Sequence, residues 1–177
     1  MSAIIERRAV SERPQAAPVP ALIELLDQLA DVILGIPADV YTARIEPTLS
    51  GSIGAHVRHV LDHIASLAVV DGRVLSYDHR ERGTAVEADP SAALRQMFRL
   101  KAALGRWLER SPDDALLVSS QVSADGTEVV GWSSFGRELA FVVSHTVHHH
   151  AMIALLLAWH GVAVPARFGL APSTPHA

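Results

Sequence analysis

Four of the ten histidines in this 177-residue chain fall within six positions: His145, His148, His149 and His150. They lie inside a long apolar run over residues 139–159, which favours a helix. His145 and His149 are four residues apart, so on a helix their imidazoles stack on one face, one turn apart. Two imidazoles at this spacing can hold one metal ion, as in other helix-borne metal motifs. A third ligand must come from elsewhere in the chain.

The helical phase separates these histidines into two groups. At about 100° per residue, His145 and His149 fall at the centre of an apolar stripe shared with Phe141 and Leu156. A buried imidazole without a partner costs on the order of 1–3 kcal/mol, and a shared cation satisfies two of them at once. By the same projection we expect His148 at the rim of the stripe, and the remaining histidine, His150, at the surface.

An earlier helical segment offers the third ligand. His56, His59 and His63 follow an i, i+3, i+7 spacing and therefore share one arc of a helix. Spacing alone does not choose among the three. A centre of three imidazoles leaves positions open for water or substrate, and neutral ligands leave the ion its full charge to acidify what it binds. Imidazoles suit a divalent metal ion such as Zn, Ni or Fe.

Glu138 lies seven residues before His145 on the same stripe and is the candidate catalytic residue. It could accept a hydrogen bond from a ligand's second N–H, act as a base or pair with an arginine. An equally good reading is a glutamate near a helix start that the helix dipole stabilises.

The composition limits what else the chain can do. Hydrophobic residues make up 49% and charged residues 19%, which favours a compact domain of packed helices. The formal charge of −4 without a basic patch argues against nucleic acid as a partner. Because cysteine is absent, any metal must be held by His, Asp or Glu, and any thiol must come from a substrate. The sequence shows neither a signal peptide nor an uninterrupted membrane span, so we expect a cytoplasmic protein without membrane partners.

The helices and strands that position these residues are predicted from the spacing of apolar residues and from the Pro and Gly residues that end them. Residues 1–19 are expected to be a flexible N-terminal segment, 20–165 the domain and 166–177 an extended C-terminal tail. Alternating residues around Asp125-Gly126 predict a β-hairpin over 116–132. The sequence thus predicts an all-α fold, a four-helix bundle with a small β-hairpin insertion before the last helix. The four expected helices cover residues 21–34, 53–75, 89–109 and 133–160.

The segment Ser52-Ile53-Gly54-Ala55-His56-Val57-Arg58-His59, with the His145/His149 pair on the last helix, resembles the DinB (damage-inducible) superfamily. That family is a four-helix bundle whose metal is held by a second-helix histidine and a later His-x-x-x-His pair. Its second-helix histidine usually follows a helix-opening Ser or Thr by seven residues, which points to His59. The resemblance implies a metal site of His59, His145 and His149, with His63 and His56 as alternates.

The resemblance also implies a function. The family includes transferases that add a low-molecular-weight thiol to an electrophile, so we expect a metal-dependent enzyme of this kind with a three-histidine centre. Two alternatives remain open: a metal-dependent hydrolase with Glu138 as base, and a non-catalytic metal-binding or stress-response bundle with a structural ion. The expected partners are a small-molecule substrate, such as that thiol, and a second copy of the chain in a homodimer.

Overall fold

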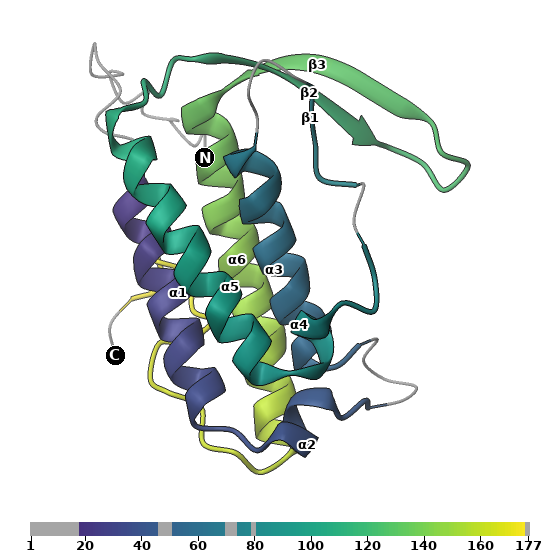
Figure 1. Ribbon diagram of the computed structural model, residues 1–177, viewed down its shortest axis with the longest axis vertical. Helices are drawn as coiled ribbons and strands as arrows, with labels where there is room; N and C mark the ends of the chain where they lie inside the picture. Colours follow the sequence, from purple (N-terminus) through teal and green to yellow (C-terminus); the bar gives the residue numbers. More distant parts are fainter. Residues whose placement is uncertain (1–17, 46–50, 70–73, 79–80, 176–177) are drawn as a thin grey trace, which may run out of the picture.

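The computed structural model describes residues 18–45, 51–69, 74–78 and 81–175. Its long helices run side by side, and a small sheet crosses one end of them (Figure 1). In chain order the elements are α1 (Val19–Leu34), α2 (Ala38–Thr42), α3 (Ile53–Ala68), β1 (Leu75–Ser76), α4 (Ala85–Ala88), α5 (Pro90–Leu104), the 3-10 helix η1 (Gly105–Glu109), β2 (Ala115–Gln121), β3 (Glu128–Ser134) and α6 (Phe135–Trp159).

The core lies between the four long helices. α3 packs against α5 and α6, and α1 packs against the same two helices. Leu22, Leu26 and Leu29 of α1 are fully buried, as the spacing of an amphipathic helix requires. α3 buries Val57 and Ile64 completely. Because each such side chain contributes roughly 1.5–3 kcal/mol on burial, apolar contacts account for the packing of α3 in the bundle without help from the histidines.

Both helices that carry histidine groups begin at a serine cap. The Ser52 hydroxyl accepts a hydrogen bond from the Ala55 N–H at 3.2 Å, and the Ser134 hydroxyl accepts one from the Arg137 N–H at 3.3 Å. Each cap satisfies an amide of the first helical turn, an interaction worth about 1 kcal/mol. The caps therefore fix where α3 and α6 begin.

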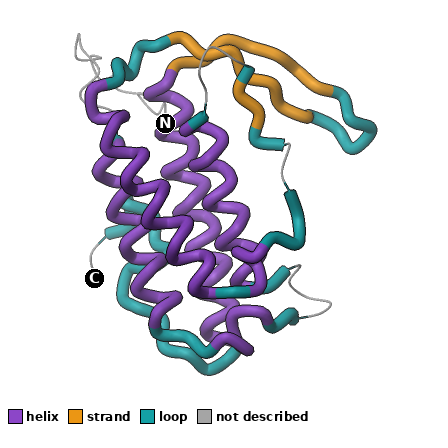
Figure 2. The backbone as a smooth tube through the Cα atoms, in the orientation of Figure 1, coloured by secondary structure: helices purple, strands orange, loops and turns teal. Residues whose placement is uncertain are grey.

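The sheet is mixed and has the strand order β1-β2-β3. β2 and β3 form an antiparallel hairpin in which Leu117 faces Trp132, and β1 pairs in parallel with β2 through Leu75 and Val118. At the hairpin turn, Gly126 has a φ of 90°, a backbone conformation that side chains disfavour. The strands lie across the end of the bundle, and the hairpin tip extends beyond it (Figure 2).

The prediction of an all-α four-helix bundle is wrong. The described residues form six α-helices and a three-stranded mixed sheet. The hairpin expected over 116–132 is present as β2 and β3, but β1 is a third strand of only two residues, too short to give a periodic signal. The short helices α2 and α4 fall in stretches without a long apolar stripe. The segment 1–19, predicted to be flexible, lies mostly outside the described residues.

α6 is the longest helix and lies against both α1 and α3. By length and composition alone it could cross a membrane, a test that the buried core helices of folded domains also pass. Within the bundle, α6 buries apolar residues along its length, among them Phe135, Val142 and Leu157.

The C-terminal segment after α6 folds back onto that helix, and this overturns the surface position expected for His150. The His150 side chain is 0% exposed and stacks on Phe168, with ring centroids 4.5 Å apart. Gly169 permits the close approach, because a Cβ there would lie only 2.6 Å from Ala151 Cα. Neither ring nitrogen of His150 has a hydrogen-bond partner in the described part of the chain. Burial lowers the pKa of His150 to about 4.

This lowered pKa makes the free energy of unfolding depend on pH. The unfolded imidazole takes up a proton below about pH 6.5 while the folded one stays neutral, so stability falls as the pH drops from about 6.5 towards 4. His150→Phe keeps the ring stack but has no group to protonate. At about pH 5.5 we expect this variant to avoid a loss of free energy of unfolding on the order of 1 kcal/mol that the wild type shows. Thermal unfolding at about pH 5.5 and about pH 8 measures this; equal pH dependence of the wild type and the variant would contradict it.

Candidate functional site

Helices α3 and α6 bring five histidines into one cluster. α3 contributes His56, His59 and His63, and α6 contributes His145 and His149. The His59 ring centroid lies 5.0 Å from that of His145 and 4.4 Å from that of His149. The two helices pack directly against each other, so residues about 90 positions apart in the sequence meet in one place. We call these five residues the histidine cluster.

Three members of the histidine cluster converge on one point. His59, His63 and His145 each offer a ring nitrogen, and these nitrogens all lie within 4.8 Å of one another. The Nε2 atoms of His59 and His145 are 2.9 Å apart. Two such nitrogens can be this close only if one of them donates a proton to the other or if both bind a shared cation.

The tautomer of His63 is fixed by its own helix. Its Nδ1 lies 2.9 Å from the backbone carbonyl oxygen of His59. A carbonyl oxygen only accepts hydrogen bonds, so Nδ1 carries the proton and donates it. The Nε2 atom then carries the lone pair that can bind a cation. A ligand histidine held in this way by a carbonyl is a recurring feature of metal sites.

His56 and His149 form a second close pair in the histidine cluster, with their Nδ1 atoms 3.0 Å apart. Burial lowers the pKa of His149 to about 3, and the neighbouring His145 adds to the shift. Burial also lowers the pKa of His56. Both imidazoles are therefore neutral at physiological pH, which is the form that a metal ion requires.

The sequence prediction of His59, His145 and His149, with His63 and His56 as alternates, named the five residues that now lie together. The three residues whose ring nitrogens lie within 4.8 Å of one another include His63 in place of His149. The Nδ1 atom of His149 lies next to that of His56. His148 is exposed at the rim, with its ring centroid 5.2 Å from that of His149.

Glu138 is 2% exposed and lies at the start of α6, where its carboxylate accepts three hydrogen bonds. The donors are Tyr77 Oη at 3.1 Å, Ser133 Oγ at 2.6 Å and Arg137 Nη1 at 3.0 Å. These contacts stabilise a buried charge, which would otherwise be costly. These three partners of Glu138 belong to the sheet end of the bundle, and the link from Glu138 to the histidine cluster is indirect.

That link is Tyr77, a residue that sequence reasoning missed. Its ring stacks on His63 with centroids 5.1 Å apart and an interplanar angle of 5°. Burial raises the pKa of the Tyr77 hydroxyl, and the Glu138 carboxylate raises it further, so the hydroxyl stays protonated and remains a donor. Tyr77 follows β1 in a polar stretch without periodicity, so no pattern in the sequence marked it.

The histidine cluster suits a transition metal. It offers only imidazole nitrogens, the ligands that Zn, Ni, Fe and Cu accept and that Mg and Ca avoid. In a tetrahedral site with metal–nitrogen bonds of about 2.0–2.1 Å, two ligand nitrogens are roughly 3.3 Å apart. The 2.9 Å between His59 and His145 needs only a small opening to reach this value.

Among curated proteins, the chain is similar to FK506-binding protein 5 of Rhizopus delemar (strain RA 99-880), with 37% identity over 102 residues. The match covers 57% of this chain and 26% of that protein, so the chain spans about a quarter of its relative's length. The chain matches no family model, and no solved structure is significantly similar to it.

This match overturns the prediction of a DinB-like metal-dependent enzyme, whether thiol-dependent transferase, hydrolase or stress-response bundle. The similar protein is named for binding FK506 and not for any of these activities. The physical reason for the error is that a few histidines at helical spacing report a local geometry and not a reaction. Membership of the DinB superfamily itself stays a prediction.

The hydrogen bond from Tyr77 to Glu138 gives a matched test of the buried network. We expect Tyr77→Phe to lower the free energy of unfolding by about 1.5–3 kcal/mol, because the lost bond reaches a buried charge. Tyr41→Phe is the control: the Tyr41 hydroxyl donates to the neutral carbonyl of Val86 at 2.7 Å, and its loss should cost only about 0.5–1.5 kcal/mol. Urea denaturation of both variants measures the difference. An equal or smaller loss for Tyr77→Phe would contradict this account of Glu138.

Proposed function

We propose that this chain binds one divalent transition metal ion, such as Zn, Ni or Fe, between α3 and α6. The single observation that supports the proposal is the convergence of ring nitrogens from His59, His63 and His145 within 4.8 Å. The ion would be held by these three imidazoles, with His149 beside them in the histidine cluster.

The chain's own residues prepare this site. The backbone carbonyl of His59 orients the His63 ring, and the Tyr77 ring stacks on a face of that imidazole. Burial keeps His149 and His56 neutral, so these two imidazoles do not repel a cation. When bound, the ion would supply a positive charge to which the three converging imidazole nitrogens coordinate.

A second candidate function is binding of FK506 itself. The observation that favours it is the 37% identity to a protein named for this property. Because the match spans about a quarter of that protein, the experiment must be done on this chain alone. Saturable binding of FK506 with a 1:1 ratio in a calorimetric titration would support the candidate, and absence of binding would remove it.

Metal analysis of the purified protein tests the metal proposal. We expect about one metal ion per chain after reconstitution, and at least a tenfold lower affinity for His59→Ala, His63→Ala and His145→Ala, because each removes a ligand. His148→Ala, at the exposed rim, is the matched control and should keep its affinity. Unchanged affinity in all three ligand variants would contradict the site.

Removal of the metal gives an independent readout. Because the ion binds the folded chain, metal at a hundredfold excess over its dissociation constant adds about 2.7 kcal/mol of stability. For a chain of this size this corresponds to a rise of about 5–10 °C in the unfolding midpoint. Thermal unfolding with and without a chelator measures the shift, and at the same metal concentration His145→Ala should show at most about half of it. The proposal fails if the wild type shows no shift with any of the three metals.

A further inference from the structure

A cavity lies on the side of α6 that faces away from the histidine cluster. It is partly open to solvent, is lined by α1, α6 and the C-terminal segment, and has a volume of about 240 Å³. Val143 and Val147 of α6 line it, and they precede His145 and His149 by two residues, or about 200° around the helix. The cavity is therefore separate from the proposed metal site.

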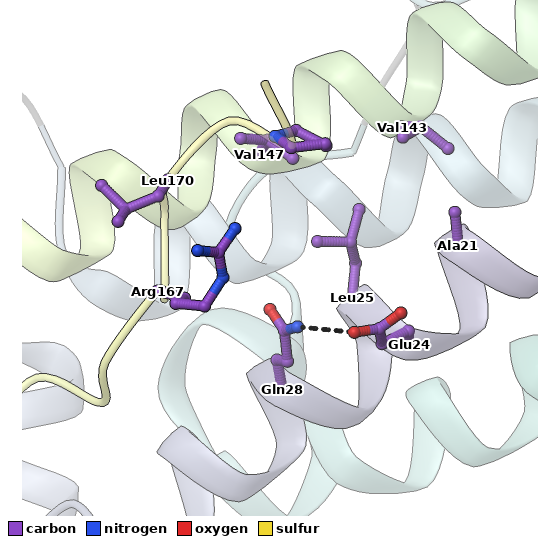
Figure 3. A pocket seen from close by; sticks show the side chains of 9 residues that line it. Ala21, Glu24, Leu25, Gln28, Val143, Val147, Arg167 and Leu170 are labelled. Carbon is purple, nitrogen blue, oxygen red and sulfur yellow. Dashed lines mark hydrogen bonds between the residues drawn. The ribbon is translucent and has the colours of Figure 1, made fainter. Parts of the chain in front are cut away.

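The lining of the cavity combines apolar and charged side chains. Figure 3 shows Leu25, Val147 and Leu170 among the apolar lining residues. The charged lining residues are a cation, Arg167 of the C-terminal segment, and an anion, Glu24 of α1. In the same view the carboxamide of Gln28 lies between these two charges, and its Nε2 donates to Glu24 Oε1 at 3.4 Å. A ligand here meets both signs of charge and an apolar surface.

The backbone holds Arg167 in a strained conformation. Its φ is 73°, the only positive value among the described non-glycine residues. Such a conformation costs about 1–3 kcal/mol and persists only where neighbouring contacts impose it. Those contacts are the Phe168 ring, stacked on His150, and Gly169, closely packed on Ala151. The anchored turn thus places the Arg167 guanidinium over the cavity, as Figure 3 shows.

We propose that this cavity binds a small zwitterion with an apolar side chain, that is, a free aliphatic α-amino acid. The guanidinium of Arg167 binds the carboxylate, with the bidentate geometry that arginine favours. The carboxylate of Glu24 binds the ammonium group. The branched side chain packs on Val143, Val147 and Leu25. The volume lies just below the roughly 300 Å³ at which sites for drug-sized ligands begin, which fits a ligand of this size.

Titration of the full chain with L-leucine tests the proposal. Wild type should bind L-leucine saturably, and binding should survive metal chelation and His145→Ala, because the two sites are separate. Arg167→Gln should weaken binding at least tenfold, and Arg95→Gln, an arginine on α5 that is 62% exposed, should leave it unchanged. Absence of saturable binding up to about 10 mM, or equal binding by Arg167→Gln, overturns the proposal.

Two further variants separate an effect on ligand binding from an effect on folding and test where the ammonium group of the ligand binds. Arg167→Gly relieves the positive φ, so its unfolding midpoint should equal or exceed that of wild type while leucine binding is lost. Glu24→Gln should weaken L-leucine at least fivefold but leave 4-methylpentanoate, which lacks the amine, unaffected. If wild type binds 4-methylpentanoate or N-acetyl-leucine as tightly as leucine, the assignment of a free amino acid is overturned.

Discussion

The packing of α3 on α6 is the constraint on which the rest of the structure depends. The two helices pack directly on each other and bury apolar side chains such as Val57, Ile64 and Val142. As a consequence, the histidines of the two helices meet. The consequence is a cluster of imidazoles at ring distances of 4.1–5.2 Å. Each close pair of ring nitrogens either shares one proton in an N–H···N hydrogen bond or binds one cation.

α6 has two faces with different chemistry. One face carries His145 and His149 towards α3, and the other carries Val143 and Val147 towards α1 and the C-terminal segment. The buried stack of His150 on Phe168 holds the C-terminal segment against α6. That segment covers the face of α6 that carries Val143 and Val147. A single helix thereby positions a candidate metal site and a candidate ligand cavity without mixing their residues.

The grouping of the histidines could be predicted from the sequence, because helical periodicity indicates which residues share a face of a helix. The spacing of His56, His59 and His63, and of His145 and His149, placed both groups on inward stripes. Helical spacing does not predict contacts between residues that are distant in the sequence. The parallel pairing of Leu75 with Val118 joins distant residues through a two-residue strand, and Tyr77 meets His63 only because that strand holds it there. His150 was predicted to lie at the surface, because the spacing within its own helix does not indicate that Phe168 covers it.

The central claim is that His59, His63 and His145 hold one metal ion. Crystals of the metal-saturated protein, measured at the absorption edge of the bound metal, test this most directly. The account predicts one strong anomalous peak within bonding distance of a nitrogen from each of the three residues. A peak bonded elsewhere, for example to His56 and His149 alone, or no peak in metal-saturated crystals, would contradict it.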